Sequence, residues 1–284
     1  MLSGYLIEKF NDMGTAYTYR RLCDEAHRAG VNLTLIGAQD SYIVENGSVQ
    51  NKGSFLEKRD FVINRYKWGL VKDLINDMVY CSYNKLEPFK IYINKFNQLR
   101  QIKSNFLRKP SYVLASNQIS YHSIVDQIGM PFVAKGLESS MGREVFLVKN
   151  ENEYKNLTND TAKEWLCEEY ISSSKGCDMR LFAVRGEAVA CMRRTSNDDF
   201  RANVALGAKV EPVAINEELR VISQEIWQQT KLDVVGIDIL FGTDCLYFCE
   251  INVMPGLLGI EQSSRKNIAR LIINSIITDL NEHN

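Results

Sequence analysis

The run VVGIDILF at residues 234–241 carries a single aspartate, Asp238, among side chains that are otherwise apolar. Such a run is typical of a buried strand, yet an ionised carboxylate is costly to bury without a partner. A second apolar segment, 246–251, follows the polar turn 242–244, so we expect an antiparallel hairpin. A hairpin centred on that turn sets Asp238 opposite Glu250. The chain is therefore restricted to folds that bring a compensating group to this hairpin.

The second strand continues into Asn252, which lies two residues beyond Glu250 and so points to the same face. Two neighbouring carboxylates repel each other unless a cation lies between them, and neither strand contains a lysine or a histidine. Mg²⁺ prefers oxygen ligands, and nucleotide phosphates can complete its shell. We therefore predict a metal site made of Asp238, Glu250 and Asn252. The alternative is that Asp238 hydrogen-bonds to backbone groups while Glu250 is exposed.

The composition of the chain limits the classes of protein to which it could belong. The 284 residues are 45% hydrophobic and 24% charged with a net charge of −1, which indicates a globular protein of two or three subdomains without nucleic-acid or membrane binding. No apolar stretch approaches the ~20 residues needed to cross a bilayer, and segment 4–10 carries charges that a signal peptide lacks. The seven cysteines include no CxxC pair, and the three histidines lie far apart. We therefore expect a cytoplasmic protein with reduced thiols and no zinc site.

The N-terminal part of the chain alternates between strand and helix patterns. We expect strands at 4–9, 31–36 and 61–64, and helices at 15–28 and 71–77. This alternation predicts a small α/β domain with a parallel sheet. No GxGxxG motif follows the first strand, so a dinucleotide site is not expected there.

From residue 93 the pattern changes to longer helices and hairpins. Residues 95–107 predict a helix that ends before Pro110. Two apolar segments flank the loop ESSMGRE at 138–144, which predicts a hairpin with a long loop. The other expected elements are strands at 132–135, 145–148, 165–171, 179–184 and 188–192, a helix capped by Asn216, and a final helix at 266–280.

Five short motifs stand out in this part of the chain: EEYI at 168–171, GCDMR at 176–180, DFRAN at 199–203, GIDIL at 236–240 and EINVMPGLLGIE at 250–261. Together they resemble the motifs of the RimK-type ATP-grasp ligases, which add glutamate to the C-terminus of a ribosomal protein. Lys95, fifteen residues before Pro110, and Lys135, at the end of an apolar strand, also match the family's spacing. The resemblance covers the chain from Lys95 onward, whereas the preceding residues are similar only in their α/β character.

This resemblance implies an ATP-grasp fold of the α/β class, α+β in part, with an N-terminal Rossmann-like pre-ATP-grasp domain. It implies domains at 1–92, 93–165 and 166–284, the second with a phosphate loop and the third with the metal site. The implied activity joins a carboxylate to an amine through an acylphosphate, using ATP and Mg²⁺, with Mn²⁺ as an alternative ion. The implied partner is an amino acid or peptide, with a protein acceptor as an alternative, and we expect a homo-oligomer.

The roles of family residues carry over to the matching positions. The metal ligands are those named above, the loop 138–144 would close over the phosphates, and the strand 168–171 would grip adenine. The resemblance implies nucleotide binding by Lys95, Lys135, Glu168, Glu169, Tyr170, Ile171, Asp178, Arg201 and Asn203. It implies catalytic roles for Arg201, Lys135 and Arg180.

Some features leave other interpretations open. Only Gly142 remains in a loop that is usually richer in glycine, and Met254 replaces a small polar residue near the expected acceptor position. Arg180 could instead pair with Glu168 or Glu169. ATP-grasp folds also host phosphotransferases, because a fold does not determine a function. A non-catalytic ATP-binding regulatory module is the second alternative.

Overall fold

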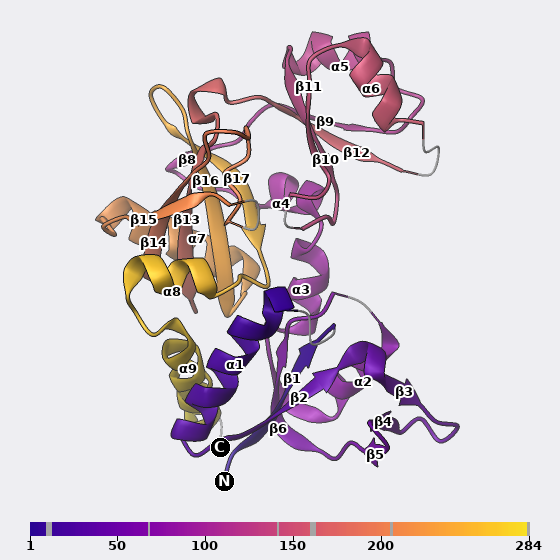
Figure 1. Ribbon diagram of the computed structural model, residues 1–284, viewed down its shortest axis with the longest axis vertical. Helices are drawn as coiled ribbons and strands as arrows, with labels where there is room; N and C mark the ends of the chain where they lie inside the picture. The colour runs from indigo at the N-terminus through magenta and orange to yellow at the C-terminus, as the bar shows by residue number, and fades with distance from the viewer. Residues whose placement is uncertain (10–12, 68, 141, 160–162, 205–206, 283–284) are drawn as a thin grey trace.

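The structure is a computed structural model that describes residues 1–9, 13–67, 69–140, 142–159, 163–204 and 207–282 (Figure 1). Within these ranges the chain forms three larger sheets and one small sheet. None of the helices in the described part of the chain is both long enough and apolar enough to cross a membrane.

A parallel sheet occupies the N-terminal part of the chain, with the strand order β2-β1-β6-β7. Its strands are β1 (Ser3–Glu8), β2 (Asn32–Gly37), β6 (Arg59–Asn64) and β7 (Val79–Tyr83). The predicted parallel pairing is confirmed, and α1 (Met13–Arg28) and α2 (Leu70–Asp77) lie in the crossovers. The sequence did not predict η1 (Ala38–Asp40) or the small antiparallel sheet of β3 (Ser41–Ile43), β4 (Val49–Asn51) and β5 (Ser54–Phe55).

The second sheet is antiparallel, with the order β11-β10-β12-β9. Its strands are β9 (Tyr112–Ala115), β10 (Phe132–Gly136), β11 (Val145–Val148) and β12 (Trp165–Glu169). The predicted hairpin of β10 and β11 is confirmed. Two helices, α5 (Tyr121–Ile128) and α6 (Glu151–Leu157), lie at the outer end of this sheet (Figure 1). The strand predicted at 165–171 is shorter than expected, because the chain turns at Ile171 into η2 (Ser172–Ser174).

The third sheet has the order β15-β14-β13-β16-β17-β8. Its strands are β8 (Leu107–Arg108), β13 (Cys177–Val184), β14 (Glu187–Thr195), β15 (Lys209–Pro212), β16 (Val234–Phe241) and β17 (Leu246–Asn252). The helix α7 (Glu217–Thr230) packs on β13 and β14. It begins as predicted, because the side-chain oxygen of Asn216 accepts a hydrogen bond from the Leu219 N–H at 3.0 Å.

The helix predicted at 95–107 is shorter than expected. The observed helix, α4, covers only Lys95–Gln101, and Ile102 then has an extended backbone with φ −68° and ψ 133°. The chain binds α7 instead of continuing the helix, since the Lys103 N–H donates to Gln229 Oε1 at 2.9 Å. This contact helps to bring β8 alongside β17.

The C-terminal helices of the chain pack against its N-terminal part. The helix α3 (Leu86–Tyr92) leads out of the parallel sheet, and α8 (Leu258–Ser264) and α9 (Ile268–Glu282) end the chain. Figure 1 shows α9 beside α1. One buried apolar cluster joins Leu22 and Ala26 of α1 to Ile272 and Ile276 of α9. The segment after β17 is therefore held against the N-terminal sheet.

Candidate active site

The hairpin of β16 and β17 brings the predicted metal ligands together. Asp238 lies opposite Glu250, and Gly236 lies opposite Asn252, so the predicted register is confirmed. Asp238 is 3% exposed, whereas the side chain of Glu250 is 28% exposed. The hairpin therefore presents one buried and one accessible carboxylate at paired positions.

Two arginines on neighbouring strands bind the buried carboxylate. Arg180 on β13 donates from Nε to Oδ1 of Asp238 at 2.7 Å and from Nη2 to Oδ2 at 2.6 Å. Arg194 on β14 donates from Nη2 to the same Oδ2 at 2.9 Å. Burial raises the pKa of Asp238, but the two guanidinium groups outweigh burial and lower the pKa to about 2. The carboxylate is therefore ionised.

These contacts correct two expectations from the sequence. The sequence predicted a metal ion, or alternatively backbone groups, as the partner of Asp238, but Arg180 and Arg194 bind it from β13 and β14. The alternative pairing of Arg180 with Glu168 or Glu169 is wrong, because its guanidinium binds Asp238 bidentately.

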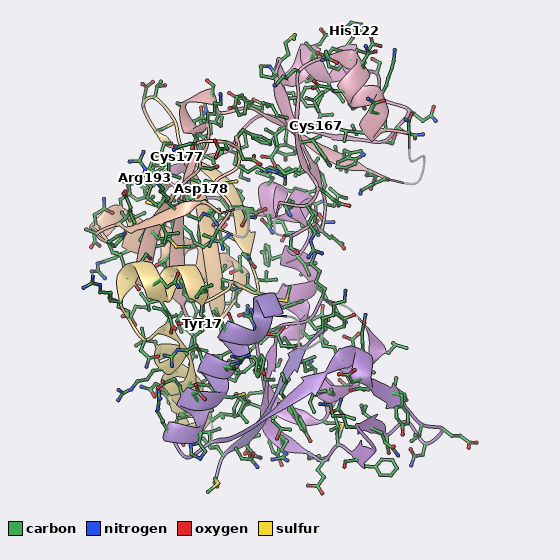
Figure 2. The ribbon with its side chains drawn as sticks, viewed as in Figure 1. Tyr17, His122, Cys167, Cys177, Asp178 and Arg193 are labelled. Atoms are coloured by element: carbon green, nitrogen blue, oxygen red, sulfur yellow. The ribbon has the colours of Figure 1, made fainter. Side chains whose placement is uncertain are left out.

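Arg194 also links Asp238 to Asp178. Its Nε and Nη2 donate to the two carboxylate oxygens of Asp178, each at 2.6 Å. Burial raises the pKa of Asp178 to about 6, and the contact with Arg194 opposes this rise. Arg194 was not predicted as a site residue, although two consecutive arginines end its strand opposite the GCDMR motif. Arg193, the other arginine, instead donates from Nε to Cys177 Sγ at 3.0 Å (Figure 2).

The two predicted phosphate-binding lysines face β17. Lys135 on β10 donates to Glu168 Oε2 on β12 at 2.7 Å and lies 3.8 Å from Cys249 Sγ. Lys95, the first residue of α4, has its Nζ 3.4 Å from Glu250 Oε2. Lys95 thus pairs with a carboxylate of the third sheet, whereas Lys135 pairs with a carboxylate of its own sheet and reaches the thiol of Cys249.

The four side chains of segment 168–171, which is predicted to bind adenine, lie in different environments. Glu168 is 3% exposed, its Oε1 has no hydrogen-bond partner among the described residues, and burial raises its pKa. Glu169 accepts a hydrogen bond at 3.1 Å from the backbone N–H of the residue before β9. Tyr170 packs edge-on against Phe200, with ring centroids 6.4 Å apart, and Ile171 is buried. Of these four predicted residues, Glu168 is the one that pairs with a predicted lysine in the described structure.

The DFRAN loop is tied to the loop between β10 and β11. Arg201 donates to both carboxylate oxygens of Asp199, with Nε–Oδ1 of 2.9 Å and Nη2–Oδ2 of 2.6 Å. Its Nη1 donates to the backbone oxygen of Gly142 at 2.5 Å. Asn203 lies on the same loop and is half-buried. The predicted phosphate loop also includes Met141, which lies outside the described residues.

The predicted ligand set fits a hard cation. It offers two carboxylates and one amide oxygen, and Mg²⁺ binds oxygen ligands. Asp238 is ionised, as a ligand must be. Asn252 Oδ1 accepts a hydrogen bond from the Met254 N–H at 2.9 Å, which leaves a second lone pair. In the described residues no group of three or more His, Cys, Asp or Glu side chains could hold a metal, so nucleotide phosphates would have to complete the shell.

The fold and the family match define an ATP-grasp ligase, an enzyme that uses ATP and Mg²⁺ to join a carboxylate to an amine. The family model described as the RimK-like ATP-grasp domain matches residues 93–276. The chain belongs to this RimK-like ATP-grasp family.

Relatives in other organisms agree with this membership. A probable alpha-L-glutamate ligase from Methanococcoides burtonii is 28% identical, and the match covers 92% of this chain and 91% of that protein. The protein of the same name from Parasynechococcus marenigrum is 26% identical, and the match covers 92% of this chain but 59% of that protein.

Two solved structures show the shared fold. The D-alanine–D-alanine ligase from Bacillus anthracis complexed with ATP has a TM-score of 0.73 at 15% identity, with 100% of both chains covered. The macrocyclase MdnC from Microcystis aeruginosa, bound with the precursor peptide MdnA, has a TM-score of 0.73 at 14% identity, with 98% of this chain and 100% of that chain covered. The predicted ATP-grasp fold is confirmed.

Proposed function

We propose that this ligase joins the amine of glutamate to a carboxylate of a peptide or protein. The RimK-like family match and the relatives named probable alpha-L-glutamate ligases support glutamate as one substrate. Met254, two residues after Asn252, is one of the positions at which this chain departs from the family pattern. It bears on which acceptor is used and not on the reaction type.

The position of Glu250 carries the proposal. It lies opposite Asp238, its Oε2 is 3.4 Å from Lys95 Nζ, and its side chain is 28% exposed. The neighbouring Cys249 lies 3.8 Å from Lys135 Nζ. A nucleotide polyphosphate at this point would meet two ammonium groups together with carboxylates that can hold a cation.

The protein groups around the predicted metal ligands prepare the site before substrates bind. When bound, Mg²⁺ supplies positive charge that stabilises the phosphoryl group in transfer. Arg180 and Arg194 fix the orientation of the Asp238 carboxylate. Lys95 and Lys135 would neutralise phosphate charge from the opposite side, so that little reorganisation is needed during the reaction.

The proposed reaction has two steps. In the first, a carboxylate oxygen of the substrate attacks the γ-phosphorus of ATP, and ADP leaves. In the second, the amine attacks the carbonyl carbon of the acylphosphate, phosphate leaves with that oxygen, and the amine loses a proton. Arg201 binds the backbone of the loop between β10 and β11, and we assign it to hold this loop over the phosphates. Closure of the loop would exclude water, which otherwise hydrolyses the acylphosphate.

ADP release with Mg²⁺-ATP, glutamate and pools of short peptides tests this proposal, with mass spectrometry of each active pool. We expect a product one water lighter than the sum of glutamate and one pool member, and no product when glutamate is omitted. ADP with a phosphorylated end product would indicate a phosphotransferase instead. ATP binding without turnover would indicate a regulatory module, which the retained metal ligands argue against.

A further inference from the structure

The strand β17 carries two of the predicted metal ligands near its end. On the side of β17 away from β16, the described residues supply one strand, β8, which pairs with Leu246 and Tyr247 at the beginning of β17. Glu250 and Asn252 lie at the other end. Buried backbone groups at a sheet edge need hydrogen-bond partners other than a strand. The alignment of this end of β17 therefore depends on side chains.

The side chain of Gln98 pairs with the backbone of Ile251 in the way that a strand would. Its Oε1 accepts a hydrogen bond from the Ile251 N–H at 2.8 Å, and its Nε2 donates to the Ile251 backbone oxygen at 3.0 Å. Nε2 also donates to the backbone oxygen of Tyr92 at 2.6 Å, and Gln98 is 2% exposed. Ile251 lies between Glu250 and Asn252, so the two bonds hold the peptide groups that join it to both predicted ligands.

Side chains from the N-terminal sheet continue this arrangement along the chain. Asn84, which follows β7, donates from Nδ2 to the backbone oxygen of Val253 at 3.0 Å. Arg65, which follows β6, donates from Nη1 to the backbone oxygen of Pro255 at 3.1 Å. Alternate residues after Glu250 are thus held through their backbones by side chains from an earlier part of the chain. Glu250 and Asn252, at the intervening positions, carry the oxygen atoms of the predicted metal site.

The helix that carries Gln98 also carries a predicted phosphate-binding lysine. Lys95 and Gln98 lie three residues apart in α4, a spacing that places both on one face of the helix. Lys95 Nζ lies 3.4 Å from Glu250 Oε2 and donates to the backbone oxygen of Ser139 at 2.5 Å. The contact of Gln98 with Ile251 therefore fixes the position of the Lys95 helix relative to Glu250.

We propose that Gln98 is a positioning residue of the metal site, which holds Glu250 and Asn252 in the geometry that binds the divalent cation of Mg²⁺-ATP. This inference rests on the proposed function and deepens it. Gln98 would touch neither the cation nor the nucleotide, because its amide is bonded to the backbone of Ile251 and Tyr92. Groups that orient metal ligands in this way contribute about tenfold to 100-fold to metal affinity. Loss of Gln98 should therefore weaken binding of the cation more than binding of the nucleotide.

Calorimetric titration of the full chain with a non-hydrolysable ATP analogue, in Mn²⁺ and in EDTA, tests this role. We expect Gln98→Met to weaken binding in Mn²⁺ by about tenfold to 100-fold, with binding in EDTA nearly unchanged. Gln229→Met is the matched control, because Gln229 binds the N–H and the backbone oxygen of Lys103 at 2.9 and 2.7 Å, on a segment without predicted ligands. This control should change neither affinity. Equal losses in Mn²⁺ and in EDTA, or no loss in Gln98→Met, would overturn the proposal.

A double-mutant cycle shows whether Gln98 acts through Glu250. In the Glu250→Gln background, Gln98→Met should weaken binding in Mn²⁺ by a small part of its effect in the wild type, because residues that act together are not additive. Full additivity would contradict the assignment. If circular dichroism shows that Gln98→Met does not fold, Gln98→Asn replaces it in both experiments, since its amide is too short to reach both groups of Ile251.

These binding measurements separate the inference from the proposed function, because they need no turnover. Unchanged binding in Mn²⁺ for Glu250→Gln would reject the metal site and the role of Gln98 with it. The expected cycle in an enzyme that ligates no substrate would reject the proposed reaction and retain Gln98 as a positioning residue.

Discussion

The guanidinium of Arg180 binds both carboxylate oxygens of Asp238, at 2.7 and 2.6 Å. Arg194 binds Asp238 as well as Asp178, so the four side chains form a buried line of alternating charges. Such a network is stabilising only while every member is paired, because an uncompensated buried charge is strongly unfavourable. The predicted metal ligand is therefore positioned by groups that also hold the sheet together.

Removal of the central arginine should destabilise the protein. We expect Arg194→Met to lower the free energy of unfolding by about 3–5 kcal/mol, since it leaves Asp178 and Asp238 without a shared cation. Urea denaturation measures this change. Arg193→Met is the matched control, because Arg193 contacts Cys177 instead, and its effect should stay below about 1 kcal/mol. Equal effects of the two variants would show that the network does not stabilise the fold.

Glu250 offers a more direct test of the metal site than Asp238, because substitution of Asp238 would leave Arg180 and Arg194 without their shared carboxylate. We expect Glu250→Gln to lower kcat by about 100-fold or more while the unfolding midpoint stays near that of the wild type. Glu250 is accessible, and its buried partner Lys95 still donates to the backbone oxygen of Ser139 at 2.5 Å after the substitution. Glu211→Gln, on the exposed strand β15, is the control. Wild-type turnover in Glu250→Gln would reject the assignment of Glu250 as a metal ligand.

We expect Arg201 to contribute mainly to kcat. Arg201→Ala should reduce kcat by about 100-fold to 1000-fold, because it removes a positive charge and frees the phosphate loop. Steady-state kinetics with varied ATP measures kcat and KM separately, with Arg220→Ala on the surface of α7 as the control. A change in the KM of ATP alone would make Arg201 an anchor of the bound nucleotide.

Asp233 makes stability depend on pH. It is 8% exposed, its Oδ2 has no hydrogen-bond partner among the described residues, and burial raises its pKa from 3.8 to about 6. Arg185 and Lys85 oppose this rise, and Asp279 adds to it. A raised folded-state pKa contributes stability that is complete below pH 3.8 and is lost as the pH rises through 6.

Asp233→Asn removes this titration. We compare the free energy of unfolding of the variant with that of the wild type at each pH. This difference should be about 3 kcal/mol more favourable to the variant at pH 8 than near pH 4, because the wild type carries a buried ionised carboxylate at pH 8. Urea denaturation at several pH values measures the difference between variant and wild type. A difference that does not change with pH would show that Asp233 titrates normally.

The pairs nearer the turn, such as Phe241 with Leu246, would continue to Cys249 opposite Asp238, and a shift of the register between Asp238 and Ile239 brings Glu250 there instead. The hairpin itself could be predicted, because its turn is short and its strands are apolar. The contact of Arg194 with Asp238 could not, because it spans the intervening strand β13 and depends on the strand order of the sheet. The early end of α4 at Gln101 has a similar origin, since contacts with α7 override the local helical pattern. The β3–β5 sheet has strands too short for a periodic pattern.

The central claim is that a substrate carboxylate is activated as an acylphosphate, and oxygen-isotope transfer tests it most directly. The carboxylate substrate found in the ligation assay is labelled with ¹⁸O, and the released phosphate is analysed by mass spectrometry. The two-step reaction predicts one ¹⁸O atom in each phosphate, because the attacking oxygen leaves with phosphorus. Phosphate without label, formed together with the ligated product, would contradict carboxylate activation and the role proposed for this site.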